Sequence, residues 1–241
     1  MGAVLIAELV KLKRSLVLLL IAGAAGMILV MLPAVIVTGN APDDWMRLSM
    51  SGAAIWAYLL MPLTATALTA LAAGIEHQNQ GWTWTLALPA PKPAVFAAKA
   101  VIAALAMAGT GALVGGAILA GGLAGSALAP QHALSGAPPA AFLAELLAKM
   151  WLAGLLALAI QFFAAHVFRS FAVPIVVGIA GTFVSVVATS AQLGIYFPWL
   201  LPVNMLASEP ERAMQALLTG SVGGVAVFAL AIVWLSRKDW R

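Results

Sequence analysis

The side chains that could do catalytic chemistry are few and far apart in this chain of 241 residues. His77, His132 and His166 are its three histidines, and cysteine is absent. Ser221, in the run Thr-Gly-Ser-Val-Gly, is a candidate nucleophile for an intramembrane hydrolase. No histidine near it comes with a group that would orient it as a base. Isolated histidines without paired carboxylates match no metal-ligand spacing, so hydrolysis and metal chemistry are both disfavoured.

Nucleotide chemistry has no motif in the chain either. The sequence contains no Gly-x-x-x-x-Gly-Lys-Ser/Thr run and no Gly-x-Gly-x-x-Gly run after a strand. The lack of cysteine excludes disulfides, thiolate chemistry and cysteine metal sites. We therefore expect no cofactor and no metal on this chain, and no catalytic residue.

The composition points to lipid as the solvent. Hydrophobic residues make up 63% of the chain and charged residues only 8%, whereas soluble domains have about 45–50% and about 25%. A helix needs about 20 apolar residues to cross about 30 Å of hydrocarbon. Residues 1–241 are therefore predicted to be one all-α, polytopic membrane domain.

Six apolar runs are long enough to cross a membrane. Each is continuous, which favours helices over the alternating strands of a barrel. The fourth and fifth runs are separated only by Arg169 and Ser170, so that boundary is the least defined. The predicted spans are Ser15–Val37, Ser51–Gly74, Ala100–Leu123, Glu145–Phe168, Phe171–Leu193 and Ala213–Leu235.

Lysine and arginine predict the orientation of these spans. With the N-terminus in the cytoplasm, nine basic residues fall inside and three outside, so both termini are predicted to be cytoplasmic. The basic excess indicates topology, with some attraction to anionic lipid, rather than a nucleic-acid surface. The inner residues are Lys11, Lys13, Arg14, Lys92, Lys99, Arg169, Arg237, Lys238 and Arg241, and the outer ones are Arg47, Lys149 and Arg212.

The N-terminal residues 1–14 show a helical stripe before the first span. Leu5, Leu9, Leu12 and Leu16 recur at helical spacing, which is typical of a helix lying in the membrane interface. A plain extension of the first span fits the stripe equally well. The apolar run after Arg14 exceeds 20 residues, which disfavours a cleavable signal peptide with its core of 7–15 residues.

The segment EHQNQGWTWTLALPAPKPAVFAAK is unusually polar and aromatic for this chain. It reads as a short helix with indoles between proline-fixed ends, suited to docking into a groove on another protein. An aromatic belt at headgroup depth is the alternative reading. Its distinctive positions, in order, are Glu76, Gly81, Trp82, Thr83, Leu86, Leu88, Pro89, Lys92, Phe96 and Lys99.

This pattern resembles the cytoplasmic loop between the second and third spans of ABC-2 type ABC exporter permeases, especially the lantibiotic-immunity and bacitracin-resistance branch. The resemblance implies a type V exporter fold in which the loop contacts a separate ATPase subunit. It also implies that Glu8, Lys11 and Lys13 belong to an amphipathic connecting helix. The segment between the fifth and sixth predicted spans is similar to the outer segment that caps the translocation path in these permeases. This similarity implies candidates for an outer gate, for which an aromatic anchor is the alternative. The candidates are Phe197, Pro198, Trp199 and Pro202.

The resemblance implies a function and partners. The chain is expected to be the permease subunit of an exporter in the bacterial inner membrane, moving an antimicrobial peptide, lipid or drug outward. ATP and Mg belong to the partner ATPase, and a second permease completes the transporter as a homodimer or a paralogous pair. The alternative is a non-transporting membrane assembly or accessory protein that docks a cytoplasmic partner.

Small and polar residues inside the spans predict packing. Glycines four apart let helices approach closely, and we expect them to pack within the chain rather than between copies. Glu145 and Lys149 lie one turn apart and are expected to pair. His166 is expected to be solvated at the inner end of its span. The glycine pairs are Gly111 and Gly115, Gly121 and Gly125, and Gly220 and Gly224.

Overall fold

The computed structural model describes residues 2–13, 15–78, 81–86, 90–189 and 191–240, with the backbone alone described at positions 3, 12, 13, 83, 84, 86 and 192. Within these ranges the chain is helical and contains no β-strand. The elements in order are α1 (Gly2–Lys13), α2 (Val17–Val37), α3 (Trp45–Ile55), η1 (Trp56–Leu60), α4 (Met61–His77), α5 (Gly81–Leu86), α6 (Lys92–Leu128), η2 (Pro130–His132), α7 (Ala140–Val167), α8 (Ala172–Ala188), η3 (Gln192–Tyr196), η4 (Val203–Leu206) and α9 (Pro210–Arg237).

Five of the predicted spans are helices long and apolar enough to cross a membrane. They are Val17–Val37, Trp45–His77, Lys92–Leu128, Ala140–Val167 and Pro210–Arg237. The predicted span Phe171–Leu193 is shorter in the structure, because α8 has 17 residues. At 1.5 Å per residue α8 is about 25 Å long, a little less than the hydrocarbon thickness of about 30 Å.

The second span is one helix of 33 residues with a wider turn in its middle. The turn η1, Trp56–Leu60, is π-helical and directly precedes Pro62. Proline has no backbone N–H to donate to the preceding turn, which accounts for the local widening. Asp44 caps the start of the helix by accepting a hydrogen bond from the backbone N–H of Arg47 at 2.8 Å.

The glycine pairs pack within the chain, as predicted. A Cβ at Gly125 would lie 2.6 Å from Ile36, and one at Gly121 would lie 3.3 Å from Leu32, so α6 lies close against α2. A Cβ at Gly224 would lie 2.6 Å from the backbone of Leu155, so α9 lies close against α7. The main apolar core lies between α2, α3, α4, α6 and α7.

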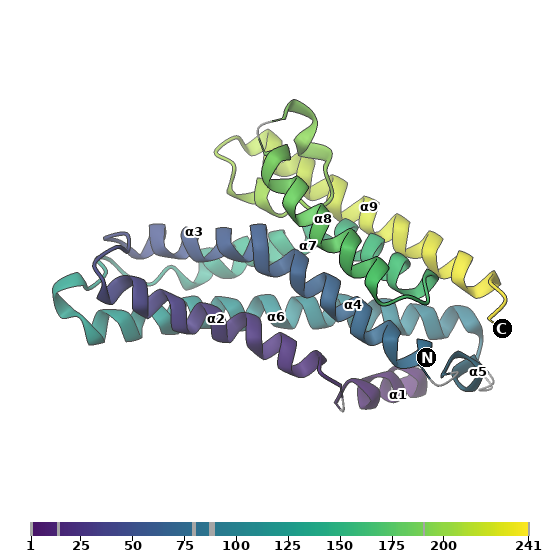
Figure 1. Cartoon of the computed structure of the whole chain (residues 1–241). Helices are drawn as coiled ribbons and strands as arrows, with labels where there is room; N and C mark the ends of the chain where they lie inside the picture. The colour runs from purple at the N-terminus through teal and green to yellow at the C-terminus, as the bar shows by residue number, and fades with distance from the viewer. Residues whose placement is uncertain (1, 14, 79–80, 87–89, 190, 241) are drawn as a thin grey trace.

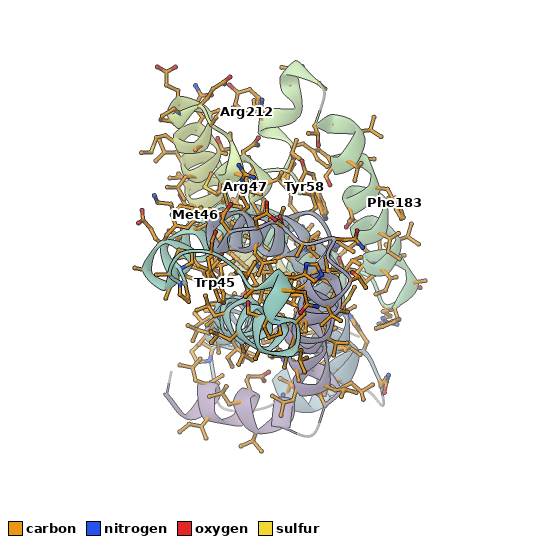
Figure 2. All side chains as sticks on the ribbon, turned by 90° about the vertical axis from the view of Figure 1, so that its left-hand side faces the viewer. Trp45, Met46, Arg47, Tyr58, Phe183 and Arg212 are labelled. Atoms are coloured by element: carbon orange, nitrogen blue, oxygen red, sulfur yellow. The ribbon has the colours of Figure 1, made fainter. Side chains whose placement is uncertain are left out.

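Figure 1 shows α1, α5 and the C-terminal end of α9 gathered at one end of the bundle, which we call the basal end. The loops α2–α3 and α6–α7 meet at the opposite end. There the backbone N–H of Ser135 donates to the carbonyl of Asp43 at 2.9 Å. Figure 2, which views the molecule from that end, places Trp45, Met46 and Arg47 at the start of α3 and Phe183 on the outer side of α8.

Candidate functional site

The turn that leads into α5 depends on Gly81. Helix α4 ends at His77, Gln78 is extended, and the backbone N–H of Gly81 donates to the carbonyl of Gln78 at 3.0 Å. A Cβ at position 81 would lie 2.8 Å from the Cα of Glu76 and 2.9 Å from its carbonyl oxygen. Only a residue without a side chain fits so close to the backbone of α4, which explains the glycine that the sequence pattern singled out.

Four charged side chains from α1, α4 and α6 form an ionic cluster at the basal end. The Nζ of Lys99 donates to Glu8 Oε2 at 2.5 Å and to Glu76 Oε1 at 2.7 Å. The Nζ of Lys11 donates to Glu8 Oε1 and to Glu76 Oε1, both at 2.8 Å. The cluster therefore joins the N-terminal helix to the second and third spans, on either side of α5.

The ionic cluster is largely removed from solvent and is electrically balanced. Glu76 is 2% exposed and Lys99 is 8% exposed. Burial lowers the pKa of Lys11, but the hydrogen bonds to Glu76 and Glu8 outweigh burial, so its pKa is raised above the usual lysine value. Two carboxylates and two ammonium groups balance one another in charge, and the loss of one partner would leave an uncompensated buried charge.

An aromatic cluster beside these charges holds α5 in place. The indole N–H of Trp82 donates to His77 Nδ1 at 3.1 Å, and His77 Nε2 is 2.9 Å from the carbonyl of Ala165. These two contacts require the proton of neutral His77 to be on Nε2. The ring of Trp82 also lies 5.5 Å from that of Phe96 and 5.8 Å from that of His166.

The C-terminal residues close over α5. The ring centroids of Trp240 and Trp82 are 4.2 Å apart. The Nζ of Lys238 lies 4.7 Å from the centre of the Trp240 ring and donates to the carbonyl of Val167 at 2.8 Å. The chain end is thus fixed to α5 and to the end of α7. Sequence reasoning missed Trp240, and only its residue type, a terminal indole after a basic pair, hinted at a docked end.

The indole of Trp82 is not on the surface of this chain, where the sequence analysis expected it. It was expected to be presented to a partner, but it is 7% exposed and packs among Phe96, His166 and Trp240. A short helix of six residues cannot bury its indole within itself, so the neighbouring spans and the C-terminus enclose it. The aromatic-belt reading of Trp82 is wrong for the same reason, because the ring contacts protein rather than the surroundings.

His166 also differs from its expected state. It was expected to be solvated, but it is 1% exposed, and its Nδ1 lies 2.8 Å from the carbonyl of Phe162. Its Nε2 and Glu76 Oε2 have no hydrogen-bond partner within the described part of the chain. Both residues line a cavity of about 30 Å³, which is large enough for a water molecule.

The remaining loop predictions divide into described and undescribed positions. Lys92 is exposed at the start of α6, where it is free to meet another protein surface. The side chains of Thr83, Leu86 and Lys13 lie outside the described part of the structure. Leu88 and Pro89 lie outside the described residues altogether.

Helix α1 exposes its apolar stripe and turns its charges inward. Ile6, Leu9 and Val10 are half or more exposed, whereas Glu8 is buried in the ionic cluster and Lys11 is part-buried there. The apolar residues of an amphipathic helix usually face the core of the protein. Here the protein side of the helix is the charged one, so the apolar side is left for lipid or another apolar surface.

The segment between α8 and α9 inserts into the bundle. Trp199 is 7% exposed, and a Cβ at Gly181 would lie 2.5 Å from its indole, so α8 packs directly on this ring. Pro202 lines a small cavity with Trp199 and Met61. Phe197 lies 5.6 Å from Trp199, ring to ring, and is part-buried like Pro198. Trp199 is therefore not the lipid-facing anchor that was the alternative to a gate.

Two further predictions concern α7 and metals. The Nζ of Lys149 lies 2.5 Å from Glu145 Oε1, so the predicted pair is confirmed. In the described ranges no three His, Cys, Asp or Glu side chains come close enough to hold a metal ion.

Comparison with known proteins assigns the family. No curated protein and no solved structure matches the chain at a significant level. The family model described as "ABC-2 family transporter protein" matches residues 4–185, which is more than half of the chain and runs from α1 into the last turn of α8. The region matched contains both the ionic cluster and α5. This multi-pass helical chain belongs to the ABC-2 transporter family.

Proposed function

We propose that the chain is the transmembrane permease subunit of an ATP-driven exporter, working with a separate ATPase and a second permease. The observation that carries the proposal is the construction of the basal end. There a short helix, α5, packs through the ring of Trp82 on Phe96 of α6, His166 of α7 and Trp240. Beside it, the ionic cluster joins α1, α4 and α6. A partner that moves α5 would move the second and third spans with it. Family membership supports the same division of labour.

A sixth crossing by α8 fits the direction of the chain. Helix α7 ends at the basal end, where the Val167 carbonyl accepts from Lys238, and α9 both follows α8 and returns to that end. The segment from Arg169 to Glu209 must therefore travel away from the basal end. Six crossings place both termini on one side, which the lysine and arginine distribution assigns to the cytoplasm.

The ATPase is proposed to contact the side of α5 that faces away from the bundle. Trp82 and Thr85 are buried, and the helical step of 100° places positions 83 and 84 on the opposite side of α5. Lys92 is exposed nearby at the start of α6. The docking surface thus moves from the indole of Trp82 to positions 83, 84 and 92. Assembly in the inner membrane, with ATP and Mg on the partner, completes the proposal.

The cargo path is proposed to run along the groove between α2, α4 and α8. This groove has a volume of about 390 Å³, and its lining includes Met27, Leu63, Thr64 and Ile179. An apolar wall with a few hydroxyl groups suits an amphipathic cargo. The resemblance to immunity permeases favours an antimicrobial peptide among these. The gate candidates are retained, because their segment packs between α8 and the neighbouring spans. They are Phe197, Pro198, Trp199 and Pro202.

ATP turnover in membranes tests the proposal. The chain is co-produced with a candidate ATPase of the same organism and reconstituted in lipid nanodiscs. We expect turnover that needs both proteins and that rises with cargo. A complex that assembles but never responds to any amphipathic peptide, lipid or drug would favour the accessory role instead.

Two variants test the docking surface. Trp84→Asp places a charge at the centre of the proposed contact and should weaken assembly by about tenfold or more. Lys92→Glu reverses a peripheral charge and should weaken it by roughly fivefold. Arg47→Glu, at the opposite end of the bundle, is the matched control and should leave assembly unchanged. Equal behaviour of all three variants would refute this docking surface.

A further inference from the structure

A groove on the outer side of α7 and α9 lies at the basal end of the bundle. Its volume is about 570 Å³. Its walls are mostly apolar, and two cations lie at one end. The residues that define it are Phe163, Val227, Leu230, Trp234, Arg237 and Lys238.

The groove opens away from the protein along a membrane span. Leu230 is 69% exposed, and Val233 and Trp234 are also exposed, although all three lie on α9. From Val227 to Arg237, the last residue of α9, the helix rises about 15 Å. This is close to half of the hydrocarbon thickness of about 30 Å, that is, one leaflet. The apolar wall takes up the first part of this rise, about 10 Å from Val227 to Trp234, and the cations follow it.

Positive charge gathers where the apolar wall ends. Arg237 is exposed, and the Nζ of Lys238 lies 5.4 Å from the centre of the Trp234 ring. Burial and the positive charge of Arg169 lower the pKa of Lys238 below the usual lysine value. Both burial and the charge of Arg169 make it less favourable for Lys238 to be positively charged. A bound anion would offset the repulsion from Arg169.

We propose that this groove binds an anionic phospholipid of the leaflet at the basal end. One acyl chain lies along Val227, Leu230 and Trp234, and the headgroup phosphate meets Arg237 and Lys238. Basic pockets beside membrane helices bind anionic headgroups in this manner. The indole of Trp234 lies where the apolar wall meets the charged end, at the depth that tryptophan prefers.

The charge pattern disfavours a second copy of the chain in the groove. A two-fold interface centred on it would bring Arg237 and Lys238 of one copy close to the same cations of the other. A cytoplasmic protein reaches only the charged end, since the apolar wall from Trp234 back to Val227 continues about 10 Å into the span. The leaflet at the basal end is the inner leaflet if the proposed orientation is correct. The binding of the lipid does not depend on that orientation.

Native mass spectrometry of the delipidated protein, purified with whatever subunits accompany it, tests the site. Phosphatidylglycerol and phosphatidylcholine with identical acyl chains are added, and the ratio of bound lipids is measured. We expect a preference for phosphatidylglycerol that falls about fivefold in Arg237→Gln. Arg237→Lys should keep the preference, and Arg47→Gln, which removes a cation from the opposite end, should not change it.

Four outcomes would overturn the proposal. The first is equal binding of the two lipids, and the second is an unchanged preference in Arg237→Gln. The third is displacement of phosphatidylglycerol by glycerol phosphate at equal concentration, which would indicate a headgroup site without an acyl groove. The fourth uses the cysteine-free background: efficient disulfide dimers of Leu230→Cys in membranes would place a second copy in the groove. Because none of these measurements requires ATP or cargo, failure here is distinct from failure of the exporter proposal.

Discussion

Trp82 and Trp199 are both 7% exposed, yet the two regions that bury them are built differently. Around Trp82, the indole N–H donates to His77 and four charged groups form salt bridges nearby. Around Trp199, the indole N–H has no acceptor within the described residues, and the ring packs against Gly181 and stacks on Phe197. Directional side-chain bonds fix the surroundings of Trp82, whereas packing fixes the ring of Trp199.

This difference bears on how each region can move. A network of hydrogen bonds and ion pairs has one good geometry, so α1, α4, α5 and α6 should move as a unit. Apolar contacts tolerate sliding at lower cost, because no buried polar partner is left behind. A rigid basal unit and a more adaptable segment between α8 and α9 are consistent with the proposed exporter, in which the ATPase acts at one end and the gate candidates lie in the other segment.

The largest expected effect breaks the ionic cluster. Lys99→Met leaves Glu8 and Glu76 close together in a buried site with only Lys11 to balance them, and should reduce the free energy of unfolding by about 3–5 kcal/mol. Thermal unfolding in detergent measures the change. Lys92→Met, at an exposed lysine of the same helix, is the control. Equal stability of the two variants would show that the cluster does not hold the basal end together.

The next effect concerns the tight approach of α5 to α4. Gly81→Ala places a Cβ 2.8 Å from the Cα of Glu76, where backbone rather than a flexible side chain must shift, and should cost about 1–3 kcal/mol. Gly109→Ala, in the interior of α6, meets nothing within 4 Å and should be neutral or stabilising by up to about 1 kcal/mol. The same unfolding assay compares them. Two neutral results would mean that the α4–α5 turn adapts freely.

A smaller effect compares the two indoles directly. Trp82→Phe removes the hydrogen bond to His77 and leaves Nδ1 unpaired, which should cost about 1–2 kcal/mol beyond the loss of ring area. Trp199→Phe removes a donor that has no acceptor in the described structure, so it should lack this extra cost. Fluorescence-monitored or calorimetric unfolding separates the variants. A larger loss at Trp199 would reverse the distinction between the two regions.

Much of this fold could be predicted from the sequence, because the hydropathy and length of each apolar run must match the hydrocarbon layer that the helix crosses. Five predicted spans are helices, and the lengths differ mainly where polar residues such as Arg47 and Lys92 continue a helix past its apolar part. The glycine spacing also predicted close helix packing. The sequence pattern could not predict which spans are in contact, because an apolar helix can pack against any other apolar helix.

The candidate site was located by its polarity but not understood from it. Glu76 and Gly81 stood out as unusual residues, and both prove structural: one carries an ion pair and the other permits a close approach. Lys99 stood out only as an inner basic residue and a position of the loop pattern, because its partner Glu8 is 91 residues away in the sequence. Trp82 looked exposed because the residues that bury it come from α6, α7 and the C-terminus. Such long-range contacts lie beyond any local pattern.

The smallest expected effect concerns how the stability of the basal end changes at alkaline pH. The pKa of Lys11 is raised in the fold, since its bonds to Glu76 and Glu8 outweigh burial, whereas burial and Arg169 lower that of Lys238. A folded-state pKa above the unfolded value gives stability that is fully present below the ordinary lysine pKa of about 10.4 and is lost as pH rises through the folded value. The lowered pKa of Lys238 has the opposite effect: its contribution to stability increases as pH rises towards about 10.4. Lys11→Gln should therefore lose less stability than the wild type as pH rises above about 10.4, and Lys238→Gln should lose slightly more as pH approaches about 10.4 from below. Parallel melting curves across this range, with Lys92→Gln as the exposed control, measure both slopes. Coincident slopes for all three variants would mean that the charges at the basal end are solvated like those of the surface, and that directional bonding does not distinguish this region from the apolar one around Trp199.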